Sequence, residues 1–330
     1  MLPRPPPAQT VGDQGHIARF ALVGPTATGK SALALALARA RGDVELISAD
    51  SMCVYRGMDI GTAKPGPEDQ RAGRYHLIDV VEANEDYSVR RFQTAARDAM
   101  AEIEGRGHVV VVVGGTGLYT RAVVDDFEIP GRWPEVATSL RRQLEEGGSR
   151  AGALLYQRLA ELDPTAASRL EASNTRRLVR ALEVTLGSGR PFSSFGPGMV
   201  AYPSTGFTII GIDLPDEVLD ARIRARFEHQ MDRGFVAETA ALIDRAGGLS
   251  ATARQALGYR EILTHLEDGV ELSQCVESAL ARIRKFARRQ RSWFRRDPRT
   301  IWLGEDLVQQ GGQALTEAVL KAAGEACLAR

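Results

Sequence analysis

The residues best suited to chemistry lie in a glycine-rich stretch near the start of the sequence. Residues 24–31 read GPTATGKS, which fits the phosphate-loop pattern G-x-x-x-x-G-K-[ST]. In such a loop, backbone N–H groups and the start of the next helix form a cradle for an anion. We expect Lys30 to reach the terminal phosphates and Ser31 to bind Mg²⁺. The residues predicted to bind the phosphate groups are Gly24, Pro25, Thr26, Ala27, Thr28, Gly29, Lys30 and Ser31.

A second glycine-rich stretch, HVVVVVGGTGLY at residues 108–119, lacks the acid that an ATPase would place there. Its valine run ends at Gly114 and Gly115, where an ATPase commonly has an aspartate that helps to hold magnesium. The acid stands instead in ISADSMCVY, as Asp50. Ligands bind beyond the carboxyl ends of parallel strands, so Asp50 and Lys30 are expected at one edge. A single acid there suits proton abstraction from an acceptor better than hydrolysis.

A structural alternative for Asp50 remains open on local sequence. An aspartate directly before a helix often caps it by accepting backbone N–H groups. Asp50 could therefore cap a helix that begins at Ser51.

Composition excludes several other classes of protein. The 330 residues carry 42 Lys and Arg against 42 Asp and Glu, so nucleic acid could bind only at a local basic patch. Cys53, Cys275 and Cys327 are widely spaced, which fits free thiols in a reducing cytoplasm. No apolar stretch reaches transmembrane length, so we expect a cytoplasmic protein with no membrane partner.

The elements that must position these residues alternate between strand and helix patterns. This alternation predicts an α/β fold, a parallel sheet with a phosphate loop and covering helices. A continuous β-branched run such as the five valines suits a central strand buried on both faces. The predicted strands are 18–23, 44–50, 108–113, 206–214 and the TIWLG segment near the end, and the predicted helices include 31–40 and 89–104.

Strand signals vanish in the middle of the chain, which predicts a helical insertion domain. Charged helical stretches cover 134–146, 151–162 and 174–186, and the segment GSGRPFSSFGPG closes the region. The predicted organisation is a disordered proline-rich tail at 1–17, a first part of the core at 18–130, the insertion at 131–200 and a second part of the core at 201–330.

Several motifs together resemble one enzyme family. GPTATGKS, ISADSMCVYRGMDIGTAKP and VVGGTGLY, in this order, resemble the tRNA dimethylallyltransferase family, also called the IPP transferase family. That family transfers an isopentenyl group to the adenine beside the anticodon. The resemblance continues through RRLVRALEV, RIRARF, QALGYRE and RKFARRQRSWFRR, and covers about residues 18 to 303.

The resemblance implies roles for particular residues. The loop would hold the diphosphate of dimethylallyl diphosphate rather than a nucleotide, with Mg²⁺ as cofactor and no ATP consumed. Asp50 matches the general base for the exocyclic amine, and Thr116 matches a contact to the target nucleotide. Arg226 matches an arginine that holds the diphosphate, with Arg222 as a weaker candidate. The expected catalytic residues are thus Asp50, Thr116 and Arg226.

A basic and aromatic segment near the end of the sequence predicts an RNA-binding surface. Residues 282–299 hold nine basic side chains against a single acid, Asp297, and Phe286, Trp293 and Phe294 lie among them. Arginine binds phosphate in a bidentate manner and aromatic rings stack on unpaired bases. By itself such a run is as often a solvated helix face, and Trp293 could be part of the core.

The resemblance favours the RNA interpretation, with the anticodon stem-loop of tRNA as partner and a monomeric enzyme. The residues expected to contact tRNA are Asp50, Ser51, Met52, Cys53, Thr116, Arg176, Arg177, Arg180, Gln255, Gly258, Tyr259, Arg260, Arg288, Arg289, Gln290, Trp293 and Arg295. One departure concerns Ala137, where many relatives carry an arginine that touches tRNA. The zinc-finger cysteines and histidines of eukaryotic members are also missing, as in bacterial members.

Two other functions remain possible from the residues. A phosphate-loop kinase of a small metabolite could use Asp50 as its base and the insertion as its lid, but it has no use for a basic and aromatic helix. An RNA-binding protein with a relic phosphate loop would not need to keep Gly29, Lys30, Ser31 and Asp50 intact.

Overall fold

A computed structural model of the chain describes residues 19–196, 198–199, 201–304, 306, 308, 314–319 and 321. The predicted tail at 1–17 therefore lies outside the described residues. The chain divides into two compact units, one of residues before 126 and after 203, the other of residues 126–203. This second unit begins five residues before the predicted insertion and ends three residues after it.

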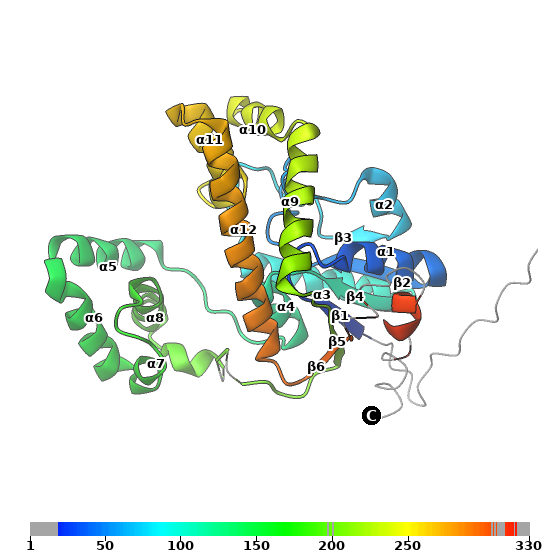
Figure 1. The fold of residues 1–330 in the computed structure, drawn as a ribbon. Helices are drawn as coiled ribbons and strands as arrows, with labels where there is room; N and C mark the ends of the chain where they lie inside the picture. Colours follow the sequence, from blue (N-terminus) through cyan, green and yellow to red (C-terminus); the bar gives the residue numbers. More distant parts are fainter. Residues whose placement is uncertain are drawn as a thin grey trace, which may run out of the picture. The chain divides into compact units, whose positions relative to one another are not determined.

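The larger unit is built on a six-stranded parallel sheet with the strand order β3-β2-β4-β1-β5-β6 (Figure 1). Every residue of β2, β4 and β5 is buried, as expected for apolar runs covered on both faces. The parallel α/β prediction is confirmed, but β3, only two residues long, was not expected. The strands are β1 (Arg19–Val23), β2 (Val44–Ser48), β3 (Tyr75–His76), β4 (Val109–Val113), β5 (Phe207–Gly211) and β6 (Thr300–Trp302).

Crossover connections place the phosphate loop and the second glycine loop next to each other. β1 leads through α1 towards β2, whereas β4 leads through α4 towards β5 on the other side. Because such crossovers are right-handed, α1 covers one face of the sheet and α4 the other. The neighbouring strands β1 and β4 thus form a topological switch point, where open α/β sheets bind ligands. The helices of this half are α1 (Lys30–Arg41), α2 (Pro67–Ala72), α3 (Val89–Gly105) and α4 (Gly117–Val124).

Four further helices of this unit stand beyond the carboxyl edge of the sheet. Two of them, α9 and α12, lie side by side (Figure 1). The buried residues of α12 recur every three or four positions, which is the pattern of a helix with one packed face. The helices are α9 (Asp216–Asp232), α10 (Phe235–Asp244), α11 (Tyr259–Asp268) and α12 (Leu272–Arg295).

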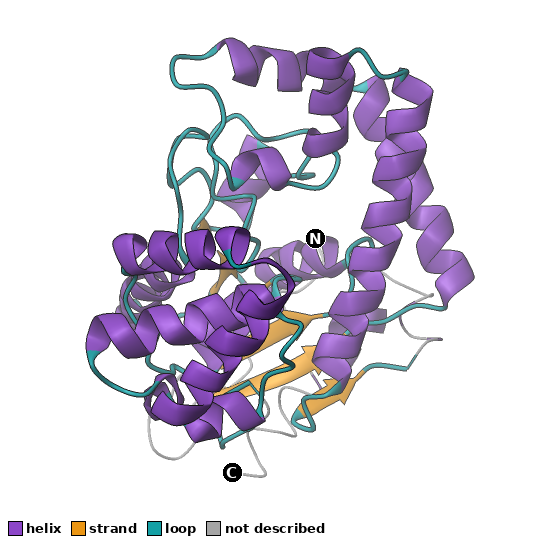
Figure 2. Cartoon of the chain, turned by 90° about the vertical axis from the view of Figure 1, so that its left-hand side faces the viewer, coloured by secondary structure: helices purple, strands orange, loops and turns teal. Residues whose placement is uncertain are grey.

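The unit of residues 126–203 is helical and has a core of its own, which includes Leu140, Leu159 and Leu182. Ala137 is 3% exposed. The strands β1 to β6, drawn in orange in Figure 2, all belong to the other unit. No helix among the described residues is long and apolar enough to span a membrane. The helices are α5 (Pro134–Glu146), α6 (Gly148–Leu162), α7 (Pro164–Ser168), α8 (Thr175–Ser188) and the 3₁₀ turn Phe192–Phe195.

Candidate active site

The phosphate loop joins β1 to α1 and begins at a position that requires glycine. Gly24 has a φ of 140°, and a Cβ added there would lie 2.0 Å from the carbonyl oxygen of Ile212. The loop can therefore pack directly on the end of β5. The next helix, α1, starts at Lys30, so the positive end of its dipole lies at the loop. The strand, loop and helix that the motif requires are all present.

The amine of Lys30 is held by the loop itself. The Thr28 hydroxyl donates to the Pro25 carbonyl at 2.9 Å, and the Lys30 ammonium donates to the same oxygen at 2.5 Å. Burial, helped by the positive charge of Arg226, lowers the pKa of Lys30 to about 7, although nearby carboxylates partly offset this. An anion bound in the loop would favour the protonated amine.

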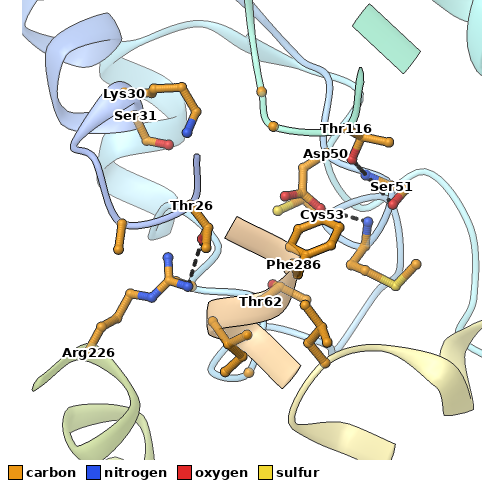
Figure 3. Close-up of a pocket in the computed structure, with 18 of the residues that line it drawn as sticks. Thr26, Lys30, Ser31, Asp50, Ser51, Cys53, Thr62, Thr116, Arg226 and Phe286 are labelled. Atoms are coloured by element: carbon orange, nitrogen blue, oxygen red, sulfur yellow. Dashed lines mark hydrogen bonds between the residues drawn. The ribbon is translucent and has the colours of Figure 1, made fainter. Parts of the chain in front are cut away.

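Arg226 reaches the loop from α9 (Figure 3). Its guanidinium donates to the Thr26 hydroxyl at 2.8 Å. Burial lowers the pKa of Arg226, but the group starts from a value so high that it keeps its charge. Arg222, one turn earlier on α9, is exposed and lines a cavity together with Arg226 and the loop. Two arginines predicted to hold a diphosphate thus lie beside the predicted phosphate loop.

Asp50 follows β2 and is fixed by its own backbone. Its Oδ1 accepts the N–H of Met52 at 2.8 Å and that of Cys53 at 3.3 Å. The helix proposed to begin at Ser51 is absent, because residues 51–57 form turns and a bridge. Oδ2 makes no hydrogen bond within the described part of the chain. Asp50 therefore presents one oxygen that can accept a proton.

Thr116 lies beside Asp50 in space, although the two come from different strands (Figure 3). The Thr116 hydroxyl accepts the N–H of Ser51 at 3.2 Å and donates to the Ser51 hydroxyl at 3.4 Å. Because β2 and β4 are adjacent, their carboxyl ends bring the two segments together. The predicted nucleotide contact, Thr116, is thus bonded to the residue that directly follows the predicted base, Asp50.

The two glycines after the valine run allow close packing within the protein. A Cβ on Gly114 would lie 2.3 Å from the carbonyl oxygen of Ala49, and one on Gly115 would lie 2.2 Å from Nε2 of Gln290. Gln290 donates to the Gly115 carbonyl at 2.8 Å and accepts the N–H of Thr26 at 2.8 Å. The missing acid is explained by this packing, since the strand end carries backbone and amide contacts instead.

These elements enclose one cavity of about 610 Å³. Apolar side chains of Phe227, Ile283 and Phe286 form part of its wall. Both Lys30 and Asp50 line it, which confirms that they share the carboxyl edge of the sheet. The predicted residues that line the cavity are Thr26, Ala27, Gly29, Lys30, Ser31, Asp50, Ser51, Met52, Cys53, Thr116, Arg222, Arg226, Gln255, Tyr259, Arg289 and Gln290.

The remaining predicted phosphate contacts support the loop from within. Gly24, Pro25 and Thr28 are buried and do not line the cavity. Their contacts go to Ile212 and to the amine of Lys30, as described above. Their part in phosphate binding stays a prediction.

The donor set of the cavity suits a magnesium ion. Mg²⁺ prefers oxygen ligands and is commonly held by one or two protein groups, water and substrate phosphates. The Ser31 hydroxyl and the Asp50 carboxylate both line the cavity. No group of three or more His, Cys, Asp or Glu residues in the described part of the chain could hold a metal alone. A magnesium ion here would therefore depend on the phosphates of a substrate.

The arginines of α12 divide into two sets. One set pairs with acids of the protein: Arg288 pairs with Asp220 on α9 at 3.0 Å, and Arg295 pairs with Asp213, which follows β5, at 3.0 Å. Arg289 belongs to the other set, where it lies over the Phe286 ring and lines the cavity. Trp293 is half-buried, and a Cβ on Gly117 would touch its indole ring. The predicted RNA surface is thus partly neutralised by the protein's own acids.

Other predicted tRNA contacts have structural partners. Arg180 on α8 donates to the carbonyls of Pro130 and Gly131, whereas Arg176 and Arg177 are exposed. Tyr259 is fully buried and donates to Glu238 at 2.6 Å. Gly258 and Arg260 flank Tyr259 but do not line the cavity. The roles of these residues in tRNA binding stay predictions.

Several residues of the site were missed from the sequence. Arg291 binds Asp213 and the Leu214 carbonyl, which joins α12 to the end of β5. Glu238 accepts the N–H of Ile60, and Gln230 donates to the Ile60 carbonyl. These bonds hold the chain just before Thr62, which lines the cavity. Asp213 could have been found from the sequence, because it lies near the end of a predicted strand. No local pattern marks Arg291, Glu238 or Gln230.

Comparison with protein families identifies a family to which the chain is similar. The model described as IPP transferase matches residues 53–297. Among curated proteins, the chain is 46% identical over 288 residues to a tRNA dimethylallyltransferase of Kocuria rhizophila, with 87% of this chain and 90% of the relative covered. It is 43% identical over 287 residues to one from a Nocardioides species, covering 87% and 91% of the two chains.

Solved structures share the fold. A tRNA isopentenylpyrophosphate transferase of Bacillus halodurans superposes with a TM-score of 0.65 at 31% identity, covering 94% of this chain and 98% of that one. A eukaryotic dimethylallyltransferase acting on tRNA gives a TM-score of 0.74 at 25% identity, covering 92% and 78%.

Proposed function

Because the chain belongs to the IPP transferase family, we propose that it transfers the dimethylallyl group of dimethylallyl diphosphate to the N6 amine of the adenine 3′-adjacent to the anticodon of tRNA. It is a tRNA dimethylallyltransferase, with diphosphate as the second product. One observation carries the proposed chemistry. A carboxylate with a free oxygen, Asp50, shares one cavity with a phosphate loop whose neighbouring strand ends without an acid.

The donor would bind through its diphosphate. The backbone N–H groups at the start of α1, with Lys30 and Arg226, provide positive charge where negative charge builds up on the leaving group. A magnesium ion held by Ser31 and the diphosphate would neutralise further charge. The allylic carbon–oxygen bond can then break, because the electron-poor prenyl carbon is stabilised by resonance.

The acceptor amine would be activated by Asp50. The adenine N6 lone pair is delocalised into the ring, so the amine is a weak nucleophile. As the new nitrogen–carbon bond forms, the surplus N6 proton passes to Oδ2 of Asp50, and the bonding pair of the old carbon–oxygen bond leaves with the diphosphate. General-base help of this kind contributes about 10²- to 10⁴-fold in rate. Thr116 would contact the adenine, and its bond to Ser51, the neighbour of Asp50, supports this.

The tRNA would dock with its anticodon stem-loop on α12. Reaching a buried cavity requires the target adenine to leave its stack, at a cost of about a few kcal/mol. Arg289 and Phe286 line the cavity from α12 and can stack on bases or bind phosphate there. We propose that the enzyme acts as a monomer.

The experiment that tests this function uses unmodified tRNA, Mg²⁺ and radiolabelled dimethylallyl diphosphate, with ATP omitted. We expect label in tRNA from the wild-type enzyme, and strong reduction with Asp50→Asn. Labelling that survives the substitution would remove Asp50 from its role as base. Absence of labelling together with ATP-dependent phosphorylation of a metabolite would favour the kinase alternative.

A further inference from the structure

This inference rests on the proposed transferase function and concerns Glu238, a residue on α10 outside the predicted site. Its Oε2 accepts the N–H groups of Asp59 at 3.0 Å and Ile60 at 2.7 Å. Its Oε1 accepts the N–H of Gly61 at 3.1 Å and the Tyr259 hydroxyl at 2.6 Å. Each of the two carboxylate oxygens thus accepts two hydrogen bonds. Hydrogen bonds to a charged acceptor are stronger than neutral ones, so this carboxylate holds three successive backbone amides firmly.

The same segment, residues 59–61, is also hydrogen-bonded and packed by neighbouring helices. Gln230 on α9 is buried and donates to the carbonyls of Ile60 at 2.7 Å and Gly61 at 3.0 Å. The rings of Phe235 and Tyr259 pack so closely on Gly61 that an added Cβ would lie 2.2 Å and 2.4 Å from them. Three helices, α9, α10 and α11, therefore fix one short stretch of chain.

The end of this segment is held in an unfavourable backbone conformation. Ala63 has a φ of 52°, in the left-handed region that residues with a Cβ rarely adopt. Beyond it, the buried amine of Lys64 bonds the Tyr55 carbonyl at 2.7 Å and the carboxylates of Asp59 and Asp79 at 2.6 Å each. Such strain persists only where the surroundings over-determine it, and it is common at ligand sites.

The segment forms one wall of the active-site cavity. Gly61, Thr62 and Ala63 all line it. The Thr62 hydroxyl donates to the Met58 carbonyl at 2.6 Å, so this wall offers few free polar groups. Phe227 also lines the cavity. The diphosphate and the amine are assigned to the phosphate loop and Asp50, so the part of the ligand left for an apolar wall is the prenyl chain.

We propose that Glu238 is a positioning residue for the prenyl donor. By fixing the amides of residues 59–61, it sets the wall formed by residues 61–63 and so determines how tightly a five-carbon chain fits and how well a longer chain is excluded. The residue acts through the segment and touches no substrate.

The test uses Glu238→Gln, which keeps the shape but turns one acceptor oxygen into an NH₂ group facing donors. We expect the KM for dimethylallyl diphosphate to rise about tenfold, with the KM for tRNA changed less than about twofold. The preference for dimethylallyl over geranyl diphosphate, measured as a ratio of kcat/KM values, should fall about tenfold, within the range that a hydrophobic pocket discriminates. Tyr259→Phe removes one of the four bonds and should shift both quantities in the same direction, but less.

The matched control is Glu228→Gln on α9, an exposed carboxylate with the same change of charge and no bond to the segment. It should behave as wild type. The proposal is overturned if Glu238→Gln leaves the donor KM and the donor preference unchanged, or if both donors lose kcat equally at constant KM. If Glu238→Gln does not fold, an unchanged donor preference in Tyr259→Phe overturns the proposal. A wild-type enzyme that labels no tRNA would instead reject the proposed function itself.

Discussion

Gln290 and Thr26, 264 residues apart in the sequence, are joined by a hydrogen bond of 2.8 Å from the Thr26 N–H to the Gln290 side chain. The other end of that side chain donates to the Gly115 carbonyl. One buried amide of α12 therefore connects the phosphate loop to the glycine loop after β4. The helix that carries the basic and aromatic residues also fixes the distance between the two loops.

Breaking half of this connection should impair catalysis. Gln290→Glu keeps an acceptor for Thr26 but places an oxygen against the Gly115 carbonyl. An unsatisfied buried group costs about 1–3 kcal/mol, so we expect kcat/KM for transfer to fall about 10- to 100-fold. Steady-state labelling of tRNA measures this, with the exposed Gln274→Glu of the same helix as control. Wild-type kinetics in Gln290→Glu would show that the connection is dispensable.

Asp50→Asn should remove the proposed base but keep the turn around residue 50. The amide oxygen can still accept the N–H groups of Met52 and Cys53, but the side chain can no longer accept a proton. We expect kcat to fall about 10²- to 10⁴-fold and the melting temperature to stay within a few degrees. Single-turnover labelling and thermal unfolding give the two values. A kcat within threefold of wild type would contradict a role as general base.

Donor binding should weaken as the pH rises above neutrality. In the free enzyme the pKa of Lys30 is lowered to about 7, and the diphosphate of the proposed donor would favour the protonated amine. Between pH 7 and 9 binding must therefore take up a proton, and the KM for dimethylallyl diphosphate should rise by up to about tenfold per pH unit. Lys30→Gln should bind the donor weakly with a KM that is flat over this range. The same slope in both proteins would assign the titration to another group.

The two sets of α12 arginines should respond differently to removal. Arg289→Ala should weaken tRNA binding about tenfold, because its guanidinium is available to phosphate. The slope of the logarithm of the binding constant against the logarithm of the salt concentration should become shallower by about one. Arg288→Ala should have a smaller effect, because Asp220 already neutralises Arg288. Filter binding of tRNA at several salt concentrations distinguishes the two. Equal losses and equal salt slopes would show that tRNA displaces the acid.

Glu45, at the opposite end of β2 from Asp50, should govern stability in acid. Burial alone would raise its pKa, but hydrogen bonds from Arg106, His76 and His108 lower it from 4.5 to about 2. The stabilisation is therefore complete above about pH 4.5 and is lost as the pH falls towards 2.

The corresponding substitution is Glu45→Gln. It should destabilise the fold by about 3 kcal/mol at pH 7, and the difference from wild type should shrink below pH 4. Urea unfolding at a series of pH values measures this, with the exposed Glu68→Gln as control. A difference that is independent of pH would attribute the loss to packing rather than to charge.

Much of the fold could be predicted because its signals are local. The valine run became β4, and the helical patterns of the insertion became α5, α6 and α8 within a few residues of their predicted bounds. The phosphate loop and Asp50 were found because a strand end followed by a glycine turn or an acid is visible in a short window. Such signals need no knowledge of distant residues.

The supports of the site could not be predicted for the opposite reason. Glu238 meets Ile60 across 178 positions, and a lone glutamate on an amphipathic helix looks like a solvated residue until the packing of α10 and α11 is known. The bond of the Tyr259 hydroxyl to Glu238 shows the same limit, since nothing in the local sequence of Tyr259 indicates that partner. Arg288 and Arg295 looked available for RNA because their partners, Asp220 and Asp213, are distant in sequence.

The turn around Asp50 has a consequence for repeated turnover. Oδ1 accepts the Met52 and Cys53 amides, and these bonds do not involve Oδ2. If Asp50 is the base, as proposed, a proton taken from the amine would leave to solvent from Oδ2 without any change in the backbone. Each cycle would return the base to its starting geometry with no conformational step, so that the recovery of the base need not limit the rate.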